Sequence, residues 1–170
     1  MPKTASQRVG IFVDVQNIYH SAKNLHNARV NFSNLLEGLV GDRDLIRSVA
    51  YVVKSDSTLG EKSFFEALEK AGFELRIKDL KVYSSGVKKA DWDVGMAVDA
   101  IRIAKDLDVV ILVTGDGDFI PLVEYLKWGL GKQIEVAAFE KATSSNLKET
   151  ADRFIEIADI NNSLMDIPNK

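Results

Sequence analysis

Acidic residues stand at three places along the chain where a strand is expected to end or a helix to begin. The stretch "VTGDGDF", residues 113–119, follows an apolar run and places Asp116 and Asp118 two positions apart. Asp14 closes the apolar run "RVGIFVDV", and Asp93 lies in "DWDVGMAVDAI", just before a helical pattern. If these segments meet in the fold, their carboxylates share one cleft.

Carboxylates crowded into one cleft repel each other, and some of them would take up protons unless a cation balanced their charge. Mg²⁺ and Mn²⁺ prefer oxygen ligands and keep several waters, so such a cluster suits either ion. A site of this kind polarises a phosphodiester and lowers the pKa of an attacking water. The pattern predicts metal-dependent phosphodiester hydrolysis, with Asp14, Asp93 and Asp116 as ligands and Asp118 binding a second ion or orienting the water.

Polar neighbours could assist these carboxylates. Asn17 follows Asp14 by three residues, and its amide could orient a water or a phosphate oxygen. The hydroxyl of Thr114 is a candidate for similar work on the substrate side. Each residue also has a simpler explanation, because an Asp or Asn after a strand is commonly a turn or cap residue and "DGD" is a common turn composition.

Two further aspartates flank Asp93. Asp91 is expected to cap the helix that follows, since free amides and the helix dipole favour a carboxylate there. Asp99 lies six residues after Asp93, which rotates it by about 240° on an ideal helix. Asp99 is therefore a weaker candidate for the metal than Asp93.

Cations gather in "RIKDLKVYSSGVKK", residues 76–89, which runs directly into the segment of Asp93. They could hold a polyanionic substrate, and a neighbouring aromatic ring could stack on an unpaired base. The candidate contacts are Lys78, Lys81, Lys88, Lys89 and Trp92, with Lys88 and Lys89 preferred because they are close in sequence to Asp93. Alternatively, the lysines only protect an exposed edge strand from pairing with another sheet.

Apolar runs and helical patterns alternate along the chain. Strands are expected at residues 8–15, 44–55, 73–85 (one or two), 108–115 and 132–139. Helices are expected at residues 16–27, 31–40, 58–72, 91–107 and 119–131, with a shorter element at 144–154. The buried face of the helix at 91–107 is expected to carry Val94, Ala97, Val98, Ile101 and Ala104. This alternation predicts a parallel sheet covered on both faces, with a ligand site outside the carboxyl ends of its strands.

The composition limits the class of protein. The chain has 170 residues, 46% hydrophobic and 28% charged, which fits one domain, expected at residues 1–160 with a polar tail at 161–170. It contains no cysteine, which excludes thiolate metal sites and fits a reducing, cytoplasmic setting. No apolar run is long enough for a membrane span. With a formal net charge of −3, any nucleic acid must be bound by a local basic patch.

Three motifs resemble those of the NYN domain family, in the PIN-like nuclease superfamily. "FVDVQNIY" resembles the D-x-x-N opening of that family, and "KKADWDVGMAVDAI" and "LVTGDGDFIPLV" are similar to its second and third motifs. They follow in family order, and the bacterial LabA-like branch, formerly DUF88, is the best match. In the second motif a small residue and a glycine often precede "VDV", whereas this chain has "ADWDV".

The resemblance implies a three-layer α/β/α sandwich with a mainly parallel central sheet. It also implies a Mg²⁺- or Mn²⁺-dependent ribonuclease acting on RNA, and it allows a homodimer. Single-stranded RNA, bound without sequence preference, is the expected substrate, since nothing in the sequence resembles a base-reading module. The residues carried over as catalytic or metal-binding are Asp14, Asn17, Asp93, Asp99, Asp116 and Asp118.

Two other functions are compatible with the same residues. A catalytically silent RNA-binding or regulatory module could retain the acidic motifs and would bind without turnover. A receiver-like signalling domain could use an aspartate at a strand end to accept a phosphoryl group. The segment "VAAFEK" lacks the proline that usually follows the receiver lysine, so this interpretation ranks last.

Overall fold

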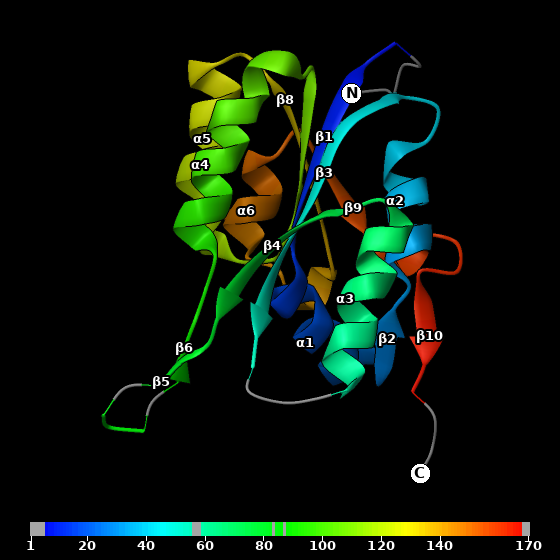
Figure 1. Cartoon of the computed structure of the whole chain (residues 1–170). Coiled ribbons are helices and arrows are strands. Elements are labelled where there is room, and N and C mark those ends of the chain that lie inside the picture. The colour runs from blue at the N-terminus through cyan, green and yellow to red at the C-terminus, as the bar shows by residue number, and fades with distance from the viewer. Residues whose placement is uncertain (1–5, 56–58, 83, 87, 168–170) are drawn as a thin grey trace.

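A six-stranded parallel sheet forms the centre of the molecule (Figure 1). The computed structural model describes residues 6–55, 59–82, 84–86 and 88–167. The strands follow the order β4-β3-β1-β7-β8-β9, and every neighbouring pair is parallel. Their bounds are β1 (Arg8–Asp14), β3 (Asp44–Lys54), β4 (Glu74–Asp79), β7 (Val109–Val113), β8 (Gln133–Ala138) and β9 (Arg153–Glu156).

Helices cover both faces of the sheet, which confirms the predicted α/β/α sandwich (Figure 1). One face carries α1 (Val15–His26), α2 (Phe32–Val40) and α3 (Leu59–Ala71). The other face carries α4 (Asp93–Ile103), α5 (Ile120–Glu124) and α6 (Ser145–Thr150). In the described part of the chain, no helix is both long enough and apolar enough to cross a bilayer.

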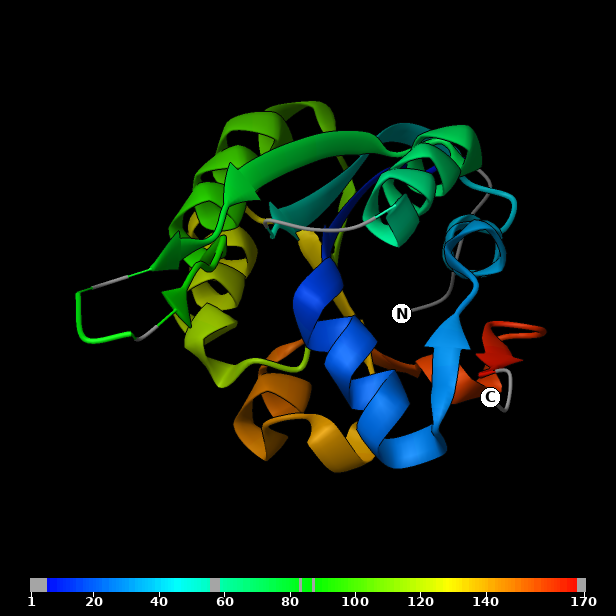
Figure 2. The ribbon, with the colours of Figure 1, turned by 60° about the horizontal axis from the view of Figure 1, so that its bottom comes forward.

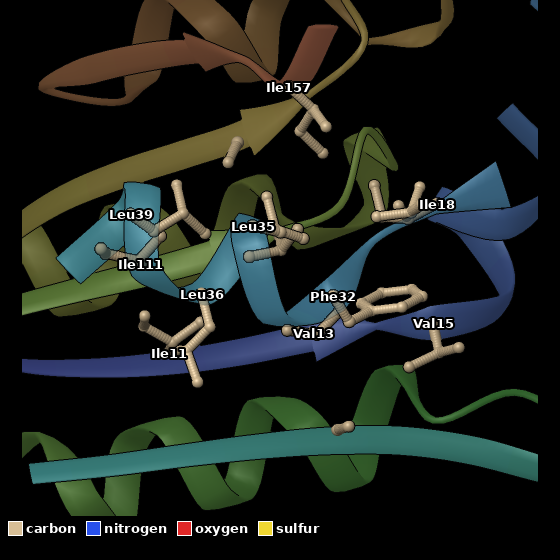
Figure 3. Packing of buried hydrophobic residues seen from close by; sticks show 14 of the residues in the cluster. Ile11, Val13, Val15, Ile18, Phe32, Leu35, Leu36, Leu39, Ile111 and Ile157 are labelled. Carbon is tan, nitrogen blue, oxygen red and sulfur yellow. The ribbon is translucent and has the colours of Figure 1, made fainter. Parts of the chain in front are cut away.

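The hydrophobic core lies in two layers, one on each side of the sheet. Along β1, Ile11 joins the layer under α1–α3, whereas Phe12 joins the layer under α4–α6. Figure 3 shows Leu35, Leu36 and Leu39 of α2 packed over the strands in the first layer. Because both faces of the central strands are buried, β1 and β7 read as continuous apolar runs rather than alternating ones.

The buried face of α4 differs from the prediction. Val94 is 77% exposed and Val98 is 55% exposed, while Met96 and Ala100 are fully buried. Among the positions predicted to be buried, Ala104, which follows the helix, is the fully buried one, and Ile101 is 40% exposed. The helix carries two apolar stripes, and the stripe that packs on the sheet is the one that includes an aspartate. Hydrophobic spacing alone does not predict which of the two stripes packs on the sheet.

Short strands complete the fold. The two-residue strands β5 (Lys81–Val82) and β6 (Lys88–Lys89) pair as an antiparallel hairpin, which projects away from the sheet before the start of α4 (Figure 2). Near the C-terminus, β10 (Leu164–Asp166) pairs with β2 (Ala28–Val30). Within the predicted polar tail, residues 164–166 form β10 and the preceding Ser163 is buried, so this part of the tail packs on the domain.

Candidate metal centre

The site lies where the strand order reverses. After β1 the chain builds β3 and β4 on one side, and after β7 it builds β8 and β9 on the other. Val13 and Val113 are paired in register, so Asp14 and Thr114 leave the sheet side by side. Figure 2 looks toward this edge, where α1 begins. Ligands of open α/β sheets bind in the crevice at such a switch point.

Asp14 is held from both sides of this crevice. Its Oδ1 accepts a hydrogen bond from the backbone amide of Asn17 at 3.4 Å, so Asp14 caps the N-terminus of α1. Its Oδ2 accepts a hydrogen bond from the Thr114 hydroxyl at 3.2 Å. Burial raises the pKa of Asp14, these two hydrogen bonds oppose the rise, and Asp116 and Asp91 add to it. The hydrogen bonds therefore fix the position of the carboxylate, and a nearby cation would stabilise its ionised form.

The loop after β7 is folded by its own polar groups. The hydroxyl oxygen of Thr114 accepts from the Asp116 amide at 3.2 Å, and Asp116 Oδ1 accepts from the Asp118 amide at 2.9 Å. The Gly115 amide donates to Asn17 Oδ1 at 3.0 Å. Asn17 thus connects the first turn of α1 to this loop. Asp116 and Asp118 of "DGD" therefore extend from a turn whose backbone is held by hydrogen bonds.

Gly115 cannot carry a side chain in this loop. A Cβ there would lie 2.7 Å from the carbonyl oxygen of Ala142. Its own carbonyl accepts a hydrogen bond from the Ser144 amide at 3.1 Å. The close backbone contact anchors the loop against the segment before α6, whose N-cap is Ser144.

Three carboxylates converge at the carboxyl edge of the sheet and are called the acidic triad below. Asp93, Asp116 and Asp118 each offer one oxygen, and these oxygens lie within 4.8 Å of one another. Burial raises the pKa of Asp93 to about 6, and the charges of Asp116, Asp91, Asp14 and Asp118 add to this rise.

The spacing of the acidic triad suits a small divalent cation. Octahedral Mg²⁺ binds oxygens at about 2.1 Å, which places the ligand oxygens roughly 3 to 4 Å apart. Oxygens that already lie within 4.8 Å need only small side-chain movements to reach that geometry. The donor set and the mutual repulsion of its charges both fit a hard cation.

A cavity of about 490 Å³ connects Asp14 with two members of the acidic triad, Asp93 and Asp116. Its lining includes Asp14, Asn17, Asp93 and Asp116. Asp14 is not a member of the triad among the described residues, but it faces the same space. The four predicted acids are therefore brought to one place, with three clustered and Asp14 across the cavity.

Asp91 and Lys78 form the rim beside Asp93. Asp91 Oδ1 accepts a hydrogen bond from the backbone amide of Asp93 at 3.1 Å. The prediction that Asp91 caps the helix is wrong, because Trp92 occupies the N-cap position of α4 and makes no side-chain cap hydrogen bond. Lys78 donates through Nζ to the Asp91 carbonyl oxygen at 2.7 Å. Of the lysines considered as substrate contacts, Lys78 thus stands next to the acidic triad.

Trp92 is packed into the fold. Its indole nitrogen donates to the Val52 carbonyl oxygen at 2.9 Å, and its ring centroid lies 5.4 Å from that of Tyr51. Lys78 Nζ lies 4.3 Å from the Trp92 ring centroid, and a Cβ at Gly95 would lie 2.6 Å from that ring. Trp92 lines the cavity, but its ring packs against Tyr51, Lys78 and Gly95. These contacts suit a side chain that positions the start of α4 better than one that stacks on a base.

Asp99 is engaged elsewhere. Its side chain is 7% exposed, and it accepts a hydrogen bond from the Tyr51 hydroxyl at 2.8 Å. Arg76 and Arg102 pair with it at 3.2 and 3.3 Å. Among the described residues it is not part of the triad. We assign Asp99 the role of fixing α4 to the sheet. Tyr51 was not predicted to contribute to the site, because it lies within β3, outside the three motifs, and no sequence pattern indicates its contact with Asp99.

The remaining candidates divide into two groups. Thr114 is fully buried, so its hydroxyl holds Asp14 and the Asp116 amide and does not reach the surface. The predicted contacts Lys81, Lys88 and Lys89 lie on β5 and β6, but their side chains fall outside the described part of the structure.

The parallel sheet, the switch-point crevice and the carboxylate cluster define an α/β protein with a candidate divalent-cation site. The chain belongs to the NYN domain family, whose model matches residues 8–160. This confirms the resemblance inferred from the three motifs. The family lies within the PIN-like nuclease superfamily, and the acidic triad is the kind of cluster that a metal-dependent nuclease requires.

One relative supports the LabA-like branch, and a solved structure supports the fold. The chain is 27% identical over 167 residues to low amplitude and bright protein LabA of Synechococcus elongatus, covering 90% of this chain and 85% of that protein. It is 26% identical over 159 residues to an uncharacterized protein of Methanocaldococcus jannaschii, of which it spans 58%. The crystal structure of a protein of unknown function from Vibrio parahaemolyticus matches with a TM-score of 0.87 and 33% identity, covering 97% of this chain and 100% of that one.

Proposed function

We propose that this protein is a Mg²⁺- or Mn²⁺-dependent ribonuclease that hydrolyses phosphodiester bonds of single-stranded RNA. The observation that carries the proposal is the convergence of Asp93, Asp116 and Asp118 within 4.8 Å at the switch point of a NYN-family sheet. The pKa of Asp93, raised to about 6 by burial and then by the neighbouring carboxylates, supports it, because a cation would stabilise the ionised form against both effects.

Each residue has a distinct task in this proposal. The acidic triad would hold the cation, and Asp14 would complete the donor set from across the cavity. Bound there, a divalent cation would polarise the phosphodiester and lower the pKa of the attacking water. Asn17 and Thr114 keep Asp14 and the loop after β7 in register, so the donors are set before substrate arrives.

The substrate strand would lie along the rim where Lys78 stands. The net charge of −3 gives the protein no general attraction for RNA, so local cations must supply it. Lys78 is next to Asp91 and Trp92, and the hairpin β5–β6 adds Lys81, Lys88 and Lys89 before α4 begins. These lysines would contact phosphates and position the strand without reading its sequence.

The decisive test compares Asp116→Asn with the parent protein and with Asp42→Asn, an exposed aspartate in the turn after α2. We expect the parent and Asp42→Asn to cleave an end-labelled single-stranded RNA in Mn²⁺ and to stop in EDTA. Asp116→Asn should cleave roughly 10²–10³-fold more slowly, as for loss of a group that stabilises transition-state charge. Circular dichroism checks that all three are folded. Equal cleavage by Asp116→Asn would refute the assignment, and RNA binding without turnover by the parent would favour the silent module.

A further inference from the structure

A second hollow opens from the catalytic cavity on the other side of α1. Its volume is about 510 Å³, and it shares Gln16, His20 and Val53 with the cavity of the acidic triad. Most of its described lining belongs to α1 and α3, and Figure 1 shows these two helices on the same face of the sheet. We call it the α1–α3 pocket, and the residues used below are Gln16, Tyr19, His20, Arg29, Phe64 and Phe65.

Aromatic side chains form a large part of the lining of this pocket. Tyr19 is 41% exposed, and its ring meets that of His20 edge-on with centroids 5.5 Å apart. Phe64 and Phe65 are half-buried, with ring centroids 6.2 Å apart. An aromatic hollow with a few polar groups is the usual form of a site for a flat organic ligand.

Charge in the pocket is suited to a phosphate at its mouth. Arg29 is exposed on β2, and within the described part of the chain no side-chain hydrogen bond or ion pair engages its guanidinium. Among the lining residues that the structure describes, Glu61 is the one carboxylate, and it accepts hydrogen bonds from the Ser55 backbone amide at 3.2 Å and the Ser55 hydroxyl at 2.9 Å. Arg29 is therefore the charge available to an anionic ligand.

We propose that the α1–α3 pocket binds an unpaired nucleobase of the RNA strand next to the scissile phosphate, with the base against Tyr19 and Arg29 on an adjoining phosphate. This inference rests on the proposed ribonuclease function. A strand whose phosphate lies at the acidic triad can continue into the pocket, because the two hollows share a wall. A base inside a duplex is stacked and paired and cannot enter, so the pocket selects single-stranded RNA.

The test measures binding in EDTA, where cleavage plays no part. Tyr19→Ala and Arg29→Ala are compared with the parent by anisotropy of a labelled single-stranded RNA. The matched controls are Tyr125→Ala, an exposed tyrosine on the α4–α5 side, and Lys105→Ala, an exposed cation just after α4. We expect each pocket variant to bind about ten-fold more weakly and each control to stay within about two-fold. Pocket variants that bind like the parent would overturn the inference.

Cross-linking provides a second readout that does not depend on the variants. RNA carrying a photoreactive 4-thiouridine at successive positions is irradiated with the parent protein, and the linked peptide is identified by mass spectrometry. A link to the peptide of Tyr19 and His20 from one or two adjacent positions is expected. Links that map only to other surfaces reject the pocket. Pocket links without Mn²⁺-dependent cleavage would instead reject the nuclease and leave the base site standing.

Discussion

The side-chain oxygen of Asn17 accepts a hydrogen bond from the Gly115 amide at 3.0 Å, although 98 residues separate the two along the chain. Asn17 lies in the first turn of α1 and Gly115 in the loop after β7, so this contact joins the two central strands just beyond the sheet. Asn17 is placed to hold the loop that presents Asp116 and Asp118. It reaches the cavity as well, so one side chain serves both the fold and the site.

Replacing Asn17 with Ala should weaken metal binding and activity more than stability. The Gly115 amide loses its acceptor, which should lower the free energy of unfolding by about 1 kcal/mol. Groups that orient metal ligands typically affect metal affinity or activity by roughly 10- to 100-fold, and we expect a drop in that range. Mn²⁺ titration by calorimetry and cleavage assays measure it. Asn146→Ala, an exposed position on α6, is the control, and an unchanged Mn²⁺ affinity for Asn17→Ala would contradict the role.

The stability of the metal-free protein should depend on the charge of Asp93. Its pKa is raised from 3.8 to about 6 in the folded state, so its protonated form favours folding. That contribution is fully present below about pH 4 and is lost as the pH rises through about 6. The full shift corresponds to roughly 3 kcal/mol, but solvent screens this partly exposed group, and we expect about 1 kcal/mol.

Asp93→Asn measures this effect directly, since it removes the charge at nearly constant shape. In EDTA the variant should be more stable than the parent at pH 7.5, and the two should converge by pH 4. Thermal unfolding followed by circular dichroism at several pH values gives the difference. Asp42→Asn should show no such trend, and a difference for Asp93→Asn that is independent of pH would refute the electrostatic explanation.

Substitutions of Asp99 and Asp118 should have opposite effects on metal-free stability and on the stabilisation that Mn²⁺ provides. Asp99→Asn weakens the contacts with Tyr51, Arg76 and Arg102, so it should lower stability by about 2 kcal/mol yet keep the stabilisation by Mn²⁺. Asp118→Asn should leave the metal-free stability nearly unchanged and reduce the gain on adding Mn²⁺. That gain reaches about 2.7 kcal/mol at 100 times the Kd. Thermal unfolding with and without Mn²⁺ separates the two, and loss of the Mn²⁺ effect in Asp99→Asn would place Asp99 in the metal site.

Gly95 should be sensitive to the smallest enlargement. A Cβ there would lie 2.6 Å from Cε3 of the packed Trp92 ring, so Gly95→Ala must displace the ring or the first turn of α4. We expect a loss of about 1–3 kcal/mol in stability and weaker Mn²⁺ binding, because Asp93 begins this helix. Gly60→Ala is the matched control, since no atom lies within 4 Å of a Cβ there and alanine favours the helix. Equal effects of the two substitutions would argue against the packing constraint.

The position of the site could be predicted because it follows from strand polarity. Asp14 ends β1 and Asp116 lies three residues after β7 ends, and the carboxyl ends of neighbouring parallel strands meet at one edge. Asp93 is reached less directly, through a helix that begins near the same edge. The approximate bounds of β1, β7 and α1 also follow from the sequence, since periodicity and continuous apolar runs identify them.

The contacts that fix α4 could not be predicted. A helix with apolar residues on both sides can bury either side, and hydrophobic spacing alone favours Val94 and Val98 over the stripe with Asp99. Burial of Asp99 is tolerated because Tyr51 and Arg76 approach it from neighbouring strands of the sheet. Such long-range compensation leaves no local pattern. The same limitation applies to Trp92, whose packing depends on Val52 and Gly95.

The adjacency of β1 and β7 also determines when the site can form during synthesis. Thr114, which fixes Asp14, is made 100 residues after it. At roughly 5–20 residues per second, translation needs about 5–20 s to bridge that interval. Until then a ribosome-bound chain has the first carboxylate but not the central partner strand. The carboxylate cluster can therefore form only after β7 and the loop that follows it have emerged from the ribosome, late in the synthesis of the 170 residues.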